Sequence, residues 1–583
     1  MRNAVSHISK LLLIFLLSSF LLSGCSVGSD APSDIGPINP APIIISEIMN
    51  WKGGTGYTDI SELNYIVCPD EELKEIAETL QKDIFVITGT NLQIIYTQQK
   101  SSDHAIILQI QDKNLLPEEY VLDIGLDILI SGADTNAIFW GTRTLLQLIL
   151  QDTSLPRGLI EDFPTYKVRG LGIDVARKPV SIDTLKEIII LMSWYKMNDL
   201  HLHLNDNAIM AYVSDSAINA YSAFRLESQI KNNDGVSITS EDYHYTLEEF
   251  AELLAFAKVY HVNIIPEFDT PAHSLAFIKV FPELTTSMDS SAEHFDLTNP
   301  AALDFAKNLW DEYATTLFAD SDVLHIGLDE SFTDSTLYYQ YADALSRYLI
   351  QQGKTVRAWG SLSQLTSDIP LDTRNIQLNI WKTTWANPED MINSGFHIIN
   401  TQSHHLYIIP GGGYDYLDNE YLYDVFEPNV FDTEELYGQI VDTIVIDPTD
   451  DHLLGAAMFI WNDFACDAID LDINEYDIYH RILFSIPYFA QKVWGTECKY
   501  SYAEFADNIS LITNIPGASY LLPNSNPQKN VLTPPYSVSF DVNLESLEEI
   551  TLFENKAPYG THSVAIKQDE QGFYLSCSTE YRE

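Results

Sequence analysis

The sequence predicts an α/β protein: a (β/α)₈ TIM barrel preceded by a small α/β domain and followed by a short β-rich tail. From Tyr166 onwards, apolar segments of strand length alternate with amphipathic segments of helix length. Eight such units fit into about 330 residues, within the size range of barrels with loop insertions. The competing fold is a doubly wound open sheet, but no glycine-rich phosphate loop follows the first strand.

The composition indicates a large, acidic, globular protein. Of its 583 residues, 46% are hydrophobic, which excludes a disordered chain and allows more than one domain. The 32 basic and 83 acidic residues give a net charge of -51, spread along the chain. Because this charge repels phosphates, we exclude nucleic acid as a partner, and a membrane surface except through an anchor.

Residues 1–25 have the pattern of a targeting segment. Arg2 and Lys10 precede an apolar run that is too short to span a bilayer comfortably, and Ser23 and Gly24 stand directly before Cys25. The pattern resembles a bacterial lipoprotein signal, in which Cys25 is lipidated; an ordinary signal peptide with an incidental cysteine is the alternative. Residues 26–43 then read as a flexible tether. We expect a protein anchored to the outer face of the bacterial cell membrane.

The other cysteines are Cys68, Cys466, Cys498 and Cys577. They lie far apart, without a CxxC pair or the spacing of metal ligands. The sequence therefore predicts no metal site, and it leaves disulfide pairing open.

Residues 44–164 are expected to form the small α/β domain, with a structural or assembly role. Short β-branched and aromatic runs predict strands at 65–67, 83–86, 92–96 and 105–108, and apolar residues at helical spacing predict helices at 71–82 and 135–151.

Residues 165–495 are expected to form the barrel. The predicted strands are 168–175, 200–204, 262–268, 323–328, 356–359, 376–381, 397–401 and 454–461, and the predicted helices include 182–197, 247–260, 300–318 and 335–352. After this barrel, residues 496–583 contain a Pro- and Asn-rich linker and alternating segments at 537–541, 549–553, 563–566 and 572–576. We expect a partial β-rich module there.

Polar and aromatic residues gather at the ends of the predicted barrel strands. In a barrel these ends converge on the face where active sites are built. The residues are Asp174, Arg177, Asp206, Glu267, Asp269, His273, Asp329, Glu330, Trp359, Trp381, Tyr407, Trp461 and Asp463.

The most informative of these are the adjacent acids Asp329 and Glu330, which end a strand of apolar residues. Two neighbouring carboxylates in a partly dry site cannot both ionise freely, so one pKa is raised and that group can act as a general acid. The alternative is that the pair only caps the helix that begins near Asp334.

The motifs 325–330, 169–177, 196–206 and 266–273 together resemble glycoside hydrolase family 20, the β-N-acetylhexosaminidases. The resemblance covers roughly residues 44–490. It implies hydrolysis of terminal β-linked N-acetylglucosamine, with N-acetylgalactosamine as a second candidate sugar, from an oligosaccharide or glycoconjugate. The implied mechanism is substrate-assisted and retaining, through an oxazolinium intermediate, and needs no cofactor.

The resemblance also implies roles for single residues. Glu330 would be the acid and base with the raised pKa, Asp329 the charged partner of the acetamido N–H, and the Tyr407 hydroxyl a donor to the acetamido oxygen. The implied sugar pocket comprises Trp359, Trp381 and Trp461 as walls, Arg177 and Asp463 as ligands of ring hydroxyls, and Asp206 and His273 as a pair supporting the acid.

Some positions depart from the family pattern. Ala208 and Ile209 stand where the motif usually continues Gln-Gly, Asp463 stands where Glu is common, and Ile408 and Ile409 follow Tyr407 where an Asp is often found. These departures resemble the branch of Gram-positive surface N-acetylglucosaminidases and leave the outer specificity open. A lacto-N-biosidase-like enzyme that releases a disaccharide and a non-catalytic glycan-binding lipoprotein are the alternatives.

Overall fold

A computed structural model describes residues 36–96, 104–111, 115–209, 217–286, 293–331, 334–363, 366–369, 371–434, 440–464, 473–518, 550–557, 560–569 and 572–581. The chain divides into two units, Met1–Ile38 and Asn39–Glu583, and every element named below belongs to the second. The predicted signal segment, including Cys25, lies outside the described residues. Within these ranges, we find no helix with the length and apolarity needed to cross a membrane.

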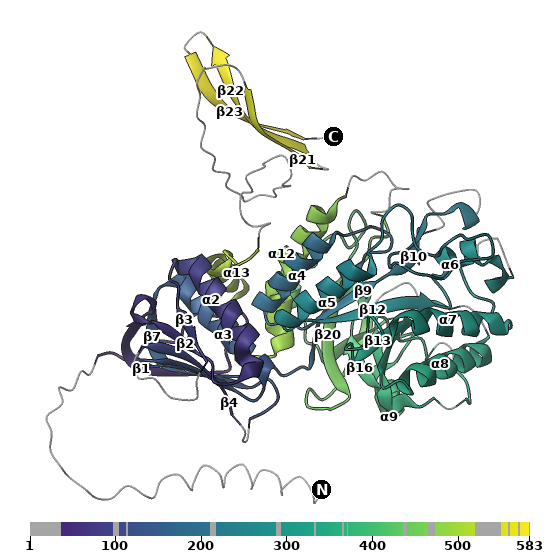
Figure 1. Ribbon diagram of the computed structural model, residues 1–583, viewed down its shortest axis with the longest axis horizontal. Helices are drawn as coiled ribbons and strands as arrows, with labels where there is room; N and C mark the ends of the chain where they lie inside the picture. The colour runs from purple at the N-terminus through teal and green to yellow at the C-terminus, as the bar shows by residue number, and fades with distance from the viewer. Residues whose placement is uncertain are drawn as a thin grey trace, which may run out of the picture. The chain divides into compact units, whose positions relative to one another are not determined.

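The N-terminal domain is a seven-stranded mixed sheet in the order β1-β7-β5-β6-β4-β2-β3. Helices α2 (Lys74–Thr88) and α3 (Thr135–Gln151) pack against it (Figure 1). The strands are β1 (Asn50–Asp59), β2 (Tyr65–Val67), β3 (Gln93–Ile95), β4 (Ala105–Ile110), β5 (Tyr120–Ile124), β6 (Ile128–Gly132) and β7 (Ser154–Asp162).

The predicted strand 83–86 is wrong, because these residues continue helix α2. Phe85 and Val86 favour a strand by their intrinsic preference. Tertiary contacts override that preference: Ile84 is fully buried, and Asp83 accepts a 2.7 Å hydrogen bond from Arg143 of α3. The helix ends only at Gly89, whose φ of 72° is the left-handed conformation that terminates many helices.

The second domain is a closed barrel of eight parallel strands, and all eight predicted strands are confirmed. The sheet runs from β16 to β20, and pairing of β16 with β20 closes it. The strands are β8 (Val168–Asp174), β9 (Asp199–His203), β12 (Asn263–Thr270), β13 (Val323–Gly327), β14 (Thr355–Trp359), β15 (Ile376–Ile380), β16 (His397–Asn400) and β20 (Leu453–Ile460).

Helices follow the strands and lie outside them, as Figure 1 shows for α4, α5, α7 and α8. The principal helices are α4 (Ile182–Trp194), α5 (Leu247–Val259), α7 (Pro300–Tyr313), α8 (Ser335–Ile350) and α12 (Glu475–Trp494). Their starts are set by capping side chains. Thr246 and Glu249 form a reciprocal capping box at α5, and Asn474 and Asp477 form one at α12.

The barrel interior is packed with aromatic side chains. A side chain at Gly172 of β8 would place its Cβ 2.0 Å from the Phe459 ring, so glycine is needed for that ring to enter the barrel. Phe459 in turn stacks on Trp461 with ring centroids 5.6 Å apart and planes 11° apart. The core therefore continues upwards into the predicted sugar pocket.

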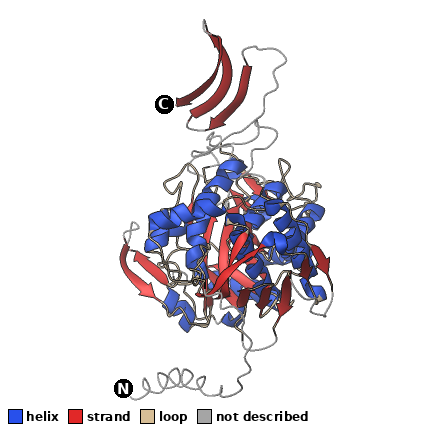
Figure 2. Cartoon of the chain, turned by 90° about the vertical axis from the view of Figure 1, so that its left-hand side faces the viewer, coloured by secondary structure: helices blue, strands red, loops and turns tan. Residues whose placement is uncertain are grey.

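Shorter elements decorate the barrel. They are β10 (Asn205–Asn207), β11 (Ser222–Phe224), α6 (Leu275–Val280), α9 (Pro388–Asn393), α10 (Ser403–Leu406), β17 (Tyr407–Ile408), α11 (Asn419–Asp424), β18 (Val430–Glu434) and β19 (Ile440–Val445). Helix α13 (Tyr502–Ile509) follows the barrel. In the tail, β21 (Ile550–Ala557), β22 (Gly560–Asp569) and β23 (Gly572–Tyr581) form an antiparallel sheet (Figure 2), while the predicted strand 537–541 lies outside the described residues.

Buried ion pairs join the two domains. Arg169, at the start of β8, pairs with Glu118 at 2.6 Å, and Lys196, after α4, pairs with Asp162 at 3.1 Å. Trp494, the last residue of α12, donates its indole N–H to Asp162 at 3.0 Å. The N-terminal domain thus contacts both the first strand and the last helix of the barrel.

Candidate active site

A tight turn at the end of β13 brings Asp329 and Glu330 to the carboxyl end of the barrel. Gly327, Leu328 and Glu330 have positive φ values of 77°, 73° and 39°. A Cβ at Gly327 would lie 1.9 Å from Asp269 Oδ1, so glycine is required there. Such strained backbone in non-glycine residues is characteristic of functional sites.

The turn is held from two sides. The hydroxyls of Tyr338 and Ser361 donate to the Leu328 carbonyl at 3.0 and 3.1 Å, and the backbone N–H of Glu330 donates to Asp329 Oδ1 at 2.9 Å. These hydrogen bonds therefore hold both acids at the carboxyl end of the barrel. The helix-cap alternative does not explain this turn, because Asp334 supplies the side-chain cap of α8.

The structure gives Asp329 a raised pKa. Asp329 is partly buried, and burial together with the adjacent Glu330 charge raises its pKa to about 7. The side chain of Glu330 is 48% exposed. Asp329 is thus an acid that binding of a cation or an N–H donor would help to ionise.

His273 and Asp206 lie next to the acid pair, as expected of a supporting pair. His273 Nδ1 is 2.9 Å from Asp206 Oδ1, and His273 Nε2 is 3.8 Å from Glu330 Oε2. Burial opposes the imidazolium form, but the charge of Asp206 holds the pKa of His273 well above its usual value. His273 is therefore a cation at neutral pH, facing Glu330 on one side and Asp206 on the other.

A buried carboxylate lies deeper in the barrel. Glu267 Oε2 contacts His203 Nδ1 at 2.5 Å and His201 Nε2 at 2.9 Å, and Glu267 Oε1 accepts from the Trp359 indole at 2.6 Å. His325 Nδ1 is 3.2 Å from the same Oε1. Burial would raise the pKa of Glu267, but the His203 charge beside it keeps that pKa well below its usual range.

Two trios in this region have donor atoms close enough for a metal ion: His201, Glu267 and His325, and His203, Glu267 and Asp269. In both trios Glu267 is already hydrogen-bonded to a histidine of the trio.

Aromatic side chains form the floor of the site. Trp359 is 1% exposed, Trp461 is 9% exposed, and their ring centroids are 5.6 Å apart. Tyr407, on β17, lies 5.7 Å from the Trp461 ring. Trp381 packs against this cluster, and its buried indole N–H has no hydrogen-bond partner among the described residues. The structure thus brings the three predicted tryptophans and Tyr407 together.

Tyr407 remains a neutral hydrogen-bond donor. Burial, together with the nearby Asp329 charge, raises its pKa well above the usual value. Its hydroxyl can therefore donate to an uncharged or negatively charged oxygen at any physiological pH.

The guanidinium of Arg177 has more partners within the protein than the sequence suggested. Its guanidinium pairs with Asp174 at 3.0 Å, Asp206 at 2.8 Å and Asp463 at 3.2 Å, and its Nε donates to the Asn207 carbonyl at 2.8 Å. The side chain is 7% exposed. Arg177 therefore joins β8, β10 and the end of β20, with little donor capacity left for a sugar hydroxyl.

His201, His203 and His325 are members of the site that were not predicted from the sequence. A signal existed: His201 and His203 alternate along β9 and so point to the same side of the strand. Phe459, near the end of β20, lies two residues before Trp461 and stacks on its ring.

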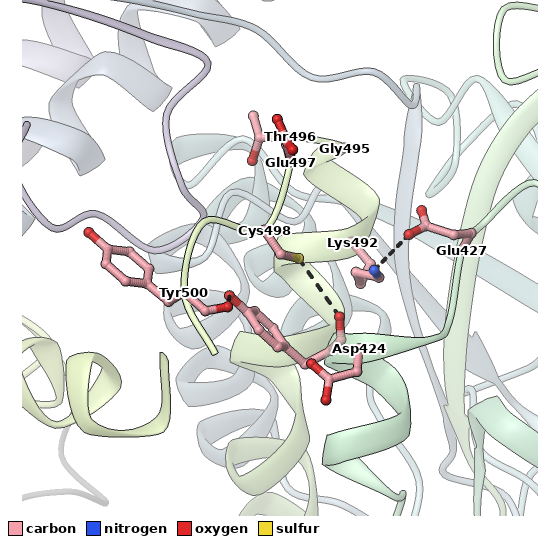
Figure 3. Close-up of a pocket in the computed structure, with 9 residues that line it drawn as sticks. Asp424, Glu427, Lys492, Gly495, Thr496, Glu497, Cys498 and Tyr500 are labelled. Carbon is pink, nitrogen blue, oxygen red and sulfur yellow. Dashed lines mark hydrogen bonds and ion pairs between the residues drawn. The ribbon is translucent and has the colours of Figure 1, made fainter. Parts of the chain in front are cut away.

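The structure also contains a cavity of about 550 Å³ at the other end of the barrel (Figure 3). It lies at the C-terminal end of α12, whose N-terminal end adjoins Ser181 at the start of α4. Its one lining cation among the described residues, Lys492, is paired with Glu427 at 2.7 Å. Since barrels bind substrates at the carboxyl ends of their strands, this cavity is not the catalytic pocket.

Comparison with known proteins agrees with this geometry. Residues 166–494 match the model of the glycosyl hydrolase family 20 catalytic domain, and residues 41–163 match domain 2 of the same family. Solved structures of β-N-acetylhexosaminidases from Streptomyces coelicolor and Bacteroides fragilis are similar, with TM-scores of 0.62 and 0.63. At 19% and 20% identity, they cover 81% and 80% of this chain and 96% and 94% of their own chains, which establishes the fold.

Two curated relatives illustrate the range of similarity. A lacto-N-biosidase from Bifidobacterium bifidum is 23% identical over 492 residues, which is 79% of this chain and 41% of that protein. A β-hexosaminidase from Akkermansia muciniphila is 30% identical over 225 residues, 35% of this chain and 43% of that protein. The alignments thus span about two fifths of the length of these relatives.

Proposed function

Because the chain belongs to glycoside hydrolase family 20, we propose that it is a retaining exo-β-N-acetylhexosaminidase acting on terminal β-linked N-acetylglucosamine. One observation supports the proposal. The strained turn after β13 holds Asp329 and Glu330 within electrostatic range of Tyr407, which packs on the tryptophan floor, so that the proposed acid, the proposed acetamido ligands and an apolar surface lie close together.

The proposed reaction has two steps. In the first, the substrate's acetamido oxygen attacks the anomeric carbon, the glycosidic C–O bond breaks, and Glu330 gives its proton to the departing oxygen. Asp329 accepts a hydrogen bond from the acetamido N–H and stabilises the positive charge of the oxazolinium ring. Tyr407 donates to the acetamido oxygen, orienting it for attack.

In the second step, a water molecule attacks the anomeric carbon of the oxazolinium ion and loses a proton to Glu330. The ring opens, the acetamido group is restored, and the product keeps the β configuration. The tryptophan floor offers an apolar surface to the sugar ring and the acetamido methyl group.

The test uses the chain without residues 1–25 and aryl β-N-acetylglucosaminides. We expect release of the phenol, a product that is first formed as the β anomer by NMR, and competitive inhibition by a thiazoline analogue of the cyclic intermediate. Binding of N-acetylglucosamine without turnover would instead support a glycan-binding lipoprotein. The same assay with N-acetylgalactosaminides tests the second candidate sugar.

A second candidate function is release of a disaccharide. It is favoured by the alignment with a lacto-N-biosidase, which extends over 79% of this chain. Mass spectrometry of the products from a defined β1,3-linked tetrasaccharide separates the two activities, because an exo-enzyme releases single sugars and a biosidase releases a disaccharide.

We also propose that Cys25 is lipidated and anchors the protein outside the cell membrane. The support is the run of small residues before Cys25 and the apolar segment that precedes them. Metabolic labelling with an alkyne fatty acid should mark the wild-type protein and fail to mark Cys25→Ser. Labelling of both proteins would contradict the proposal.

A further inference from the structure

The contacts that link Glu330 to His273 and Asp206 extend further into the barrel, to His203. His203 lies between two carboxylates, with Nε2 2.7 Å from Asp206 Oδ2 and Nδ1 2.5 Å from Glu267 Oε2. An imidazole ring can donate from both nitrogens only when it is doubly protonated. His203 is 1% exposed, so these two carboxylates define its surroundings.

Asp206 divides its two oxygens between different partners. Oδ2 accepts from His203 and from Arg177 Nη2 at 2.8 Å, whereas Oδ1 faces His273 Nδ1 at 2.9 Å and accepts from the Asn207 backbone N–H at 2.6 Å. The Asn207 N–H fixes one oxygen of the carboxylate, and its rotation about that contact is limited by the two side chains at Oδ2, His203 and Arg177. Since His273 has Glu330 on its other side, a rotation of Asp206 would move the imidazolium relative to Glu330.

We propose that His203 is a positioning residue for the proposed hydrolysis: held as an imidazolium between Glu267 and Asp206, it fixes Asp206 and so aligns His273 against Glu330. The five side chains form a row of alternating charge that ends at the proton donor. This inference rests on the proposed function, in which Glu330 transfers the proton.

The charges around this row determine the sign of the expected effect. His203 faces Glu267 and Asp269 from β12 and Asp206 from β10, with His201 of β9 nearby. His273 faces Asp206, Asp269 and Glu330, and Asp463 lies within electrostatic range. Arg177 adds a positive charge on Asp206. Removing the His203 cation leaves these acids less compensated, so that the protons shared along this row, that of His273 among them, should be held to higher pH.

The main test is His203→Gln in the chain without residues 1–25. We expect kcat to fall about tenfold on substrates with poor leaving groups, less on activated aryl glycosides, and with little change in KM. The alkaline limb of kcat/KM should move up by about 0.5 to 1 pH unit, as expected for the loss of one nearby charge.

His201→Gln is the matched control. His201 lies on the same strand and contacts the same Glu267 oxygen at 2.9 Å, but the structure gives it no hydrogen bond to Asp206. Whatever activity this variant loses through packing, its alkaline limb and its dependence on the leaving group should match those of the wild type. Identical profiles for the two variants would overturn the proposal.

A second measurement needs neither a variant nor activity. Neutron diffraction from the wild-type protein at pH 7 should show deuterium on both ring nitrogens of His203. A single deuteron would overturn the proposal even if the enzyme is active. If the protein has two deuterons on His203 but no hydrolase activity, the imidazolium between Glu267 and Asp206 is supported and the proposed function is rejected.

Discussion

Asp162 and Asp329 are both withdrawn from solvent, but their surroundings are opposite. At the domain junction, Asp162 is fully buried and accepts hydrogen bonds from the Met49 backbone, the Tyr120 hydroxyl, the Lys196 ammonium and the Trp494 indole. At the barrel mouth, Asp329 accepts one hydrogen bond that the described residues supply, from the neighbouring Glu330 N–H. It also lies beside a second carboxylate.

The difference separates a structural acid from a reactive one. A buried carboxylate is stable when its lone pairs are satisfied, and costly when they are not. Asp162 has the donors it needs within the fold. Asp329 has only one such donor among the described residues, and in the proposed mechanism the substrate's acetamido N–H provides a second.

The largest expected effect comes from the acid beside Asp329. Glu330→Gln removes the proton donor, and kcat/KM on oligosaccharides should fall about 10²- to 10⁴-fold, the usual contribution of general acid catalysis. Aryl glycosides with acidic phenols need less protonation and should lose less. Equal losses on both substrate types would argue against Glu330 as the acid.

Asp162→Asn should show the opposite pattern, with a loss of stability and little change in chemistry. It leaves Lys196, which is fully buried, without its counterion, and we expect the free energy of unfolding to fall by about 3–5 kcal/mol. Denaturant unfolding measures this loss. The folded fraction should keep a kcat near that of the wild type, and a large fall in kcat would mean that Asp162 is not purely structural.

Asp329→Asn should lower the activity and raise the stability of the protein. We expect kcat to fall about 10²- to 10³-fold because the charge opposite the oxazolinium ion is lost. At pH 8 the free energy of unfolding of the same variant should be about 1–2 kcal/mol higher than that of the wild type, because a partly buried charge with a raised pKa has been removed. A variant that is both inactive and less stable would contradict the comparison with Asp162.

The smallest expected effect is the pH dependence of the wild type. Because Asp329 must be ionised and its pKa is about 7, kcat/KM should rise about tenfold per pH unit below that value and reach its maximum before the alkaline limb begins. The folded pKa exceeds the ordinary value of 3.8, so the Asp329 contribution to stability is largest below pH 4 and is lost as the pH rises to 7. In Asp329→Asn, the acid limb near pH 7 should be absent.

Much of the architecture could be predicted from the sequence because the signals are local. The eight barrel strands follow from short apolar runs between helical segments, and the acid pair stands out because two adjacent carboxylates end one of those runs. The strand predicted at 83–86 failed because a contact with Arg143, distant in the sequence, decides the conformation there.

The electrostatics of the site could not be predicted in the same way. The raised pKa of Asp329 depends on its burial in the folded barrel and on the charge of the adjacent Glu330. The occupation of Arg177 by three carboxylates likewise joins residues up to 286 positions apart. The role of His203 requires the register that sets β9 beside β12, with His203 opposite Glu267.

The indole of Trp494 on Asp162 has a consequence for the order of folding. The two residues are 332 positions apart, so Asp162 leaves the ribosome or an export channel well before Trp494 does. During that time the N-terminal domain exists with an incomplete set of donors at its junction. The nascent chain should therefore remain sensitive to proteases at this junction until α12 emerges and docks.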